Sequence, residues 1–161
     1  MKQIIYISLF IGAPLLLMCC ASAADRPAAV PPGQLPPCPS SPNCVSTEAT
    51  DPAKQMAPLP YRVDRATSRK LIVSIVGTMP RASIVSQTDD YVHAEFRSRL
   101  FGFVDDVEFL FDDDAAVIHF RSASRSGYSD MGVNRQRMTA IGEAYRTANL
   151  DDVANARGGI D

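Results

Sequence analysis

Several sequence patterns that mark known chemistries are missing from this chain of 161 residues. It contains no His-Glu-x-x-His, no Gly-x-Ser-x-Gly and no glycine-rich phosphate loop, which removes the usual motif evidence for a zinc protease, a serine hydrolase or a nucleotide-binding enzyme. Positive charge is not in excess, because 16 basic residues stand against 18 acidic ones, so a general nucleic-acid binder is not expected. The chain also lacks tryptophan and internal repeats, and its length suggests one domain.

The N-terminus carries an apolar run over residues 4–18, which is shorter than the about 20 residues that a membrane span needs. One lysine precedes the run, and an Ala-Ser-Ala sequence ending at Ala23 follows it. This pattern predicts a secretory signal over residues 1–23 and a periplasmic or secreted protein, with no transmembrane span in the mature chain. Two alternatives remain open: an uncleaved anchor, and a lipoprotein anchored through Cys19 or Cys20, although a small residue does not precede either cysteine as is usual.

Cysteine is scarce, and loss of residues 1–23 would leave Cys38 and Cys44 as the remaining pair. Exported proteins reside in an oxidising compartment, so this pair is predicted to form a disulfide. The bridge would close a small loop and stabilise the fold by roughly 2–3 kcal/mol. A redox or metal pair is the alternative, but the spacing matches neither Cys-x-x-Cys nor a zinc pattern.

Proline divides the chain, because residues 24–60 hold ten of its twelve prolines and little periodic apolar pattern. This segment is predicted to be an extended linker or surface strap, with Val45, Met56 and Leu59 as anchors. Residues 61–149 are predicted to form the folded domain, and residues 150–161 a flexible tail.

The folded domain is predicted to begin and end with a helix. Residues 66–79 repeat apolar side chains at helical spacing, with Asp64 or Thr67 as the cap and Pro80 after the end. A second helix is expected to begin at Asn134 and to bury Met138, Ile141, Tyr145 and Ala148.

Four strands are expected between these helices, over residues 82–88, 91–98, 103–111 and 115–123. The short breaks between them contain turn residues and favour an antiparallel meander. The predicted fold class is therefore α+β: a four-stranded antiparallel meander with a helix before it and a helix after it, both packed on one face.

The alternation of side chains along these strands predicts one apolar face and one charged face. The first hairpin is predicted to close with a four-residue turn at residues 99–102, and the last hairpin with a two-residue turn at Asp113-Asp114. These turns place charged side chains opposite each other. The expected cross-strand rows are His93–Glu108–His119 and Glu95–Asp106–Arg121.

Three hypotheses compete for this charged face. The first is a face stabilised by ion pairs alone. The second is an anion site near the start of the last helix, where free N–H groups favour negative charge. Its ligand-binding residues would be Arg121, Ser124, Arg125, Ser126, Tyr128, Asn134 and Arg135. The third is a divalent metal held by His93, Glu108 and His119.

Several stretches resemble an uncharacterised family of bacterial and plastid proteins, the domain of unknown function 1499. They are residues 38–46 (CPSSPNCVS), 90–96 (DYVHAEF), 103–109 (FVDDVEF), 118–130 (IHFRSASRSGYSD) and 132–135 (GVNR). The resemblance covers about residues 35–147, in which Thr47 stands where many relatives have serine. It implies an exported or membrane-associated protein in which the cysteines belong to the domain, and it implies no particular activity.

The sequence thus favours an exported binding or structural module of the cell envelope, with an anion-binding loop of arginine and serine. The partner would be an anionic small molecule or an envelope component, and no cofactor is predicted. The alternative is a metal-assisted hydrolase using His93, Glu108 and His119, so the sequence leaves open whether the protein is an enzyme.

Overall fold

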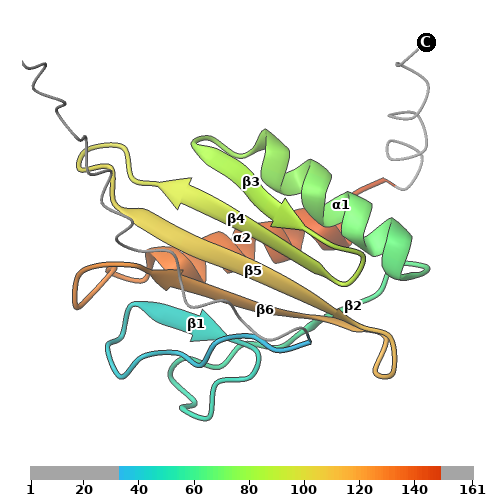
Figure 1. Cartoon of the computed structure of the whole chain (residues 1–161), viewed down its shortest axis with the longest axis horizontal. Coiled ribbons are helices and arrows are strands. Elements are labelled where there is room, and N and C mark those ends of the chain that lie inside the picture. The colour runs from blue at the N-terminus through green and yellow to red at the C-terminus, as the bar shows by residue number, and fades with distance from the viewer. Residues whose placement is uncertain (1–32, 150–161) are drawn as a thin grey trace, which may run out of the picture.

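The computed structural model describes residues 33–149, and the predicted signal peptide and C-terminal tail lie outside this range. Within it the chain forms two helices and six strands in an α+β arrangement, which confirms the predicted class (Figure 1). No helix in this range is long and apolar enough to cross a bilayer. In chain order the elements are β1 (Cys44–Ser46), β2 (Leu59–Pro60), α1 (Arg65–Thr78), β3 (Ala82–Gln87), β4 (Tyr91–Arg97), β5 (Val104–Asp112), β6 (Val117–Ser124) and α2 (Val133–Thr147).

The sheet is antiparallel, and its strands lie in the order β1-β6-β5-β4-β3, with β2 also paired to β6. Four of these strands form the predicted meander, but the prediction of a four-stranded sheet was incomplete. The proline-rich segment supplies β1 and β2, whose few residues give no alternation pattern long enough to recognise. Its expected anchors do contact the domain, since Val45 and Leu59 are in the core and Met56 packs against it.

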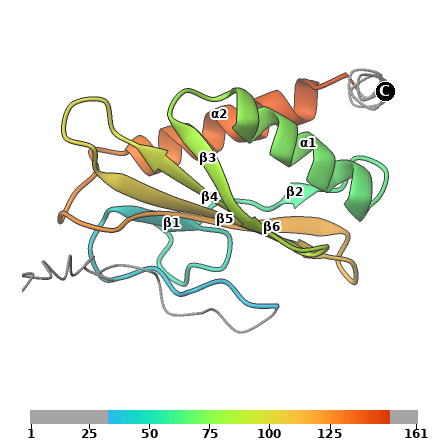
Figure 2. The same ribbon diagram turned by 45° about the horizontal axis from the view of Figure 1, so that its top comes forward.

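Both helices cover one face of the sheet, as predicted, and the chain from residue 33 to β1 lies on the other side (Figure 2). Helix α1 begins where the Asp64 carboxylate accepts a hydrogen bond from the Thr67 N–H at 2.7 Å. Helix α2 follows Gly132, whose φ of 82° suits a residue without a Cβ. The helices bury Leu71, Ile72, Val76, Met138, Ile141 and Tyr145 against the sheet.

The hairpin register explains which charged groups meet. The β4–β5 pairing is as predicted, with His93 opposite Glu108 and Glu95 opposite Asp106. The predicted β5–β6 pairing was wrong by two residues, because Glu108 lies opposite Arg121 and His119 lies opposite Leu110. A shift of two keeps every side chain on its predicted face.

The cause of the shift is the turn between β5 and β6, which contains four residues rather than two. The Asp112 carboxylate accepts hydrogen bonds from the N–H groups of Asp114 and Ala115, at 2.9 and 3.1 Å. Ala116 then takes a left-handed conformation with a φ of 50° before β6 begins. An Asp side chain that bonds the backbone two residues on is a known way to build such a turn.

Candidate functional site: the charged face of the sheet

The sheet face opposite the helices carries a cluster of charged side chains, which we call the charged face: Tyr91, His93, Glu95, Asp106, Glu108, His119, Arg121 and Arg125. Several of these groups are buried rather than solvated, including Glu108 with 1% of its surface exposed and Asp106 with 4%. Buried charges are stable only when paired and hydrogen-bonded, and the contacts below meet that requirement.

Glu108 is held by two partners at the centre of the charged face. The Tyr91 hydroxyl donates to Oε1 at 2.8 Å, and Nη1 of Arg121 donates to Oε2 at 2.8 Å. Burial, and then the nearby charge of Glu108, raise the pKa of Tyr91, so its hydroxyl stays protonated and acts as the donor. The positive charge of Arg121 thereby compensates the negative charge of Glu108, and the two hydrogen bonds fix the orientation of the carboxylate.

Asp106 is the centre of a second group of contacts. It lies 2.7 Å from Nε2 of His93 and accepts hydrogen bonds from Nε and Nη2 of Arg125 at 2.8 Å each. Burial by itself raises the pKa of Asp106, but the hydrogen bonds and charges of His93 and Arg125 outweigh it and lower the pKa to about 2.

Glu95 lies opposite Asp106, and a cation is needed between these like charges. Nη2 of Arg125 donates to Oε1 of Glu95 at 2.6 Å while also contacting Asp106, and Nη2 of Arg97 donates to Oε2 at 2.9 Å. The hydrogen bond to Asp106, more than any other contact, raises the pKa of Arg125. One guanidinium thus bridges two carboxylates, in the geometry that favours arginine over lysine.

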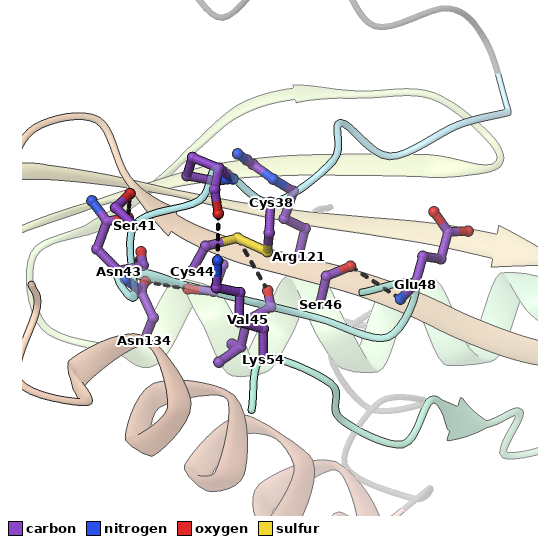
Figure 3. Close-up of a disulfide and its surroundings, with 12 residues drawn as sticks. Cys38, Ser41, Asn43, Cys44, Val45, Ser46, Glu48, Lys54, Arg121 and Asn134 are labelled. Carbon is purple, nitrogen blue, oxygen red and sulfur yellow. Dashed lines mark hydrogen bonds between the residues drawn. A yellow bond between two sulfur atoms is a disulfide. The ribbon is translucent and has the colours of Figure 1, made fainter. Parts of the chain in front are cut away.

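One nitrogen of the Arg121 guanidinium is buried without a partner. The Nε of Arg121 is buried and has no hydrogen-bond partner, whereas its Nη1 is fixed by Glu108. The side chain is 11% exposed and lies beside the Cys38–Cys44 disulfide (Figure 3). A buried donor without an acceptor costs about 1–3 kcal/mol and calls for an explanation.

The disulfide between Cys38 and Cys44 is confirmed, with a Cα–Cα distance of 5.7 Å. It pins the segment that precedes β1. Lys54 holds the same segment, since its Nζ donates to the carbonyl oxygens of Pro39 and Ser40 at 2.5 and 3.0 Å. These contacts hold the segment beside Arg121 in place.

The three residues of the hypothetical metal site are not brought together. The imidazole of His93 binds Asp106, and that of His119 lies 3.2 Å from the Thr47 hydroxyl and 3.7 Å from Asp112. Glu108 meets Tyr91 and Arg121 instead of a second histidine. In the part of the chain that the structure describes, no group of three or more His, Cys, Asp or Glu side chains could hold a metal ion.

The three arginines of the predicted anion site each contact other groups of the chain. Arg121 and Arg125 pair with carboxylates of the sheet, and Arg135 donates to the carbonyl oxygen of Ala53 at 2.6 Å. The start of α2 has its own anion, because the Asp130 carboxylate accepts from the N–H groups of Gly132 and Asn134 at 3.0 and 2.8 Å.

Asn134, predicted to bind a ligand together with Ser124, is a fully buried structural residue. Its side-chain N–H groups donate to the Asn43 carbonyl oxygen at 3.0 Å and to the Ser124 hydroxyl at 3.1 Å. Its Oδ1 accepts from the Ser122 hydroxyl and from Arg137, both at 2.6 Å. The amide thus joins the start of α2 to β6 and to the segment before β1.

Sequence reasoning missed one buried ion pair on the helix side of the sheet. Arg137 of α2 donates to the Asp105 carboxylate of β5 at 2.5 Å, and its guanidinium lies 4.7 Å from the centre of the Phe96 ring. The spacing of Asn134 and Arg137, one helical turn apart, was a usable signal that both face the sheet. The last two predicted ligand residues, Ser126 and Tyr128, are exposed in the loop before α2.

The fold and site together define a two-layer α+β domain with a buried, ion-paired sheet face and a disulfide-pinned N-terminal segment. The model of a family described as a protein of unknown function, DUF1499, matches residues 34–144, so the chain belongs to that family. The search of curated proteins and the search of solved structures each found no match.

Proposed function

We propose that this protein is an exported binding module of the cell envelope that holds an acidic group of its ligand on the unpaired edge of the Arg121 guanidinium. The observation that supports it most directly is the buried Nε of Arg121, which has no acceptor. With Nη1 committed to Glu108, Nε and Nη2 form the remaining edge of the guanidinium, and such an edge matches a carboxylate or phosphate group. The Cys38–Cys44 disulfide supports export, because disulfides persist in oxidising compartments.

The balance of positive and negative side chains around Arg121 indicates how the ligand is selected. The carboxylates of the charged face, Glu95, Asp106 and Glu108, pair with the guanidiniums of Arg121 and Arg125, and Glu95 also pairs with the exposed Arg97 beside the face. Since the ion pairs balance, hydrogen-bond geometry rather than net charge selects the ligand. A positive residue of a different shape in place of Arg121 should therefore bind the ligand more weakly.

The decisive variant is Arg121→Lys, which keeps the charge beside Glu108 but removes Nε and the planar fork. We expect inorganic phosphate and an acidic sugar such as galacturonate to shift the Arg121 Nε–Hε signal in proton–nitrogen spectra of the wild-type chain. Arg121→Lys should weaken binding at least about tenfold, as for the loss of about 1.4 kcal/mol. The matched control is Arg125→Lys, because the Arg125 guanidinium is already engaged by Asp106 and Glu95.

Two outcomes would overturn the proposal. An Nε–Hε signal that does not respond to either ligand would show that Arg121 is not the binding group. Equal affinity of the wild type and Arg121→Lys, measured by calorimetry, would show that charge alone attracts the anion.

A further inference from the structure

Exposed apolar side chains gather at one end of the molecule. Among residues 33–149, eight large apolar residues are exposed, and six of them lie in or beside two loops. We call these six the apolar end: Leu100, Phe101 and Phe103 between β4 and β5, and Tyr128, Met131 and Val133 between β6 and the first turn of α2. Leu100 is 86% exposed and Met131 is 90% exposed, so neither contributes to the core.

The two loops lie at the same end of the sheet. The chain leaving β6 stays beside the start of β5, since the Arg125 N–H donates to the Val104 carbonyl oxygen at 3.0 Å. Both views of the ribbon show the β4–β5 loop and the β6–α2 loop projecting from this end (Figures 1 and 2). The rings of Phe101 and Phe103 have centres 5.6 Å apart, so their exposed surfaces are continuous.

Charge is distributed unequally between the two ends of the sheet. Three exposed arginines, Arg81, Arg97 and Arg99, adjoin the β4–β5 loop, where Arg81 and Arg97 also exchange hydrogen bonds of 3.1 Å. The turns at the opposite end contain five aspartates, Asp89, Asp90, Asp112, Asp113 and Asp114, of which Asp113 pairs with Arg65. Asp130 lies in the β6–α2 loop and Arg97 pairs with Glu95, so the positive charge of the apolar end comes chiefly from Arg81 and Arg99, whereas the opposite end is acidic.

We propose that the apolar end docks on the surface of an anionic lipid bilayer. Aromatic side chains favour the boundary between headgroups and hydrocarbon, and arginines beside them are attracted by anionic lipids. The acidic end would be repelled by the same surface, which sets the orientation of the domain. The apolar residues project from loop tips with a basic border, a form suited to shallow insertion between lipid headgroups. This surface shares no residue with the Arg121 site, so the two proposals can fail separately.

The absence of tryptophan provides a local probe of insertion. In the full-length chain, Phe101→Trp introduces a single indole at the tip of the β4–β5 loop. With phosphatidylglycerol-containing vesicles, we expect its emission to shift to shorter wavelength and to be quenched by lipids brominated in the acyl chains. The control is Val63→Trp, because Val63 is 74% exposed but precedes α1, away from the apolar end.

The charge requirement has its own test. Adding Arg99→Gln to Phe101→Trp should weaken the vesicle-dependent shift about fivefold in lipid concentration, given about 1 kcal/mol for each basic residue near an anionic surface. Vesicles of phosphatidylcholine alone should give a weaker shift. The proposal would be overturned if vesicles shifted the emission of the Phe101→Trp and Val63→Trp variants equally. It would also be overturned if the Phe101→Trp emission did not shift although the chain sediments with vesicles. A concentration-dependent shift without vesicles would also overturn it, because the apolar end would then bind a second copy of the chain.

Discussion

Arg125 is the residue of the charged face whose side chain pairs with two carboxylates at once. It lies in the loop after β6, yet its guanidinium reaches Asp106 and Glu95 on two neighbouring strands. A buried ion pair gains little net stability when both partners are present, but the loss of one partner leaves an uncompensated charge. The residues of the charged face therefore depend on one another, and their effects should not be additive.

Asp106 should determine part of the acid sensitivity of the fold. Its pKa is lowered from 3.8 to about 2, so its contribution is fully present above about pH 4 and is lost as the pH falls through about 2. The shift corresponds to a contribution on the order of 2 kcal/mol. Urea unfolding of wild type and Asp106→Asn across this range should show a smaller loss of stability with acid in the variant.

An exposed turn residue gives the control for this measurement, since Asp89→Asn should leave the acid dependence unchanged. An Asp106→Asn variant that loses as much stability as the wild type on acidification would contradict the assignment.

At the scale of the element, the β5–β6 hairpin determines which residues become partners on the charged face. Its four-residue turn moves His119 away from Glu108 and puts Arg121 there. Ala116 adopts a φ of 50°, which strains a residue with a Cβ by about 1–2 kcal/mol. Because Ala116 lies in the turn between β5 and β6, a substitution there can relieve the strain without changing a residue of the sheet.

Ala116→Gly should therefore stabilise the protein, by about 0.5–1 kcal/mol after the entropy cost of glycine is deducted. Ala115→Gly, one position earlier in the same turn, should destabilise it slightly, because Ala115 is not in the left-handed region. Thermal unfolding of the two variants measures the difference. If both glycines lower the midpoint equally, the left-handed conformation of Ala116 is not present in solution.

The sequence predicted the helices and strands in which apolar residues repeat over many positions, and it did not predict the short strands in which they do not. The helices and four meander strands were predicted to within a residue or two, since stripes such as Leu71, Ile72 and Val76 repeat over several turns. The apolar and charged faces followed from alternation. The β5–β6 partners did not, because the Asp112 contacts that lengthen the turn depend on side-chain conformation. Strands β1 and β2 are too short to show any period, and they form only against β6.

At the scale of the whole molecule, the Cys38–Cys44 disulfide fixes the N-terminal segment to the rest of the domain. Replacing both cysteines with alanine should reduce the free energy of unfolding by roughly 2 kcal/mol, the chain-entropy estimate for a small loop. The midpoint of urea unfolding measures this loss.

The matched control replaces Cys19 and Cys20 with alanine, because these cysteines precede the described domain. That variant should unfold at the wild-type midpoint. A double variant of Cys38 and Cys44 with unchanged stability would mean that the segment stays docked through Asn43 and Lys54 without the bridge.

The pairing of β1 and β2 with β6 also has a consequence for the order in which the chain can fold. Cys44 meets Ala123, and Leu59 meets Ile118, so the early strands have no partner until most of the chain has been synthesised. Contacts between such distant positions form late and slowly, whereas the cysteine loop, with a separation of 6 residues, can close at once. In an oxidising compartment the disulfide can thus form before docking, and a chain ending before β6 would leave both early strands without a sheet to join.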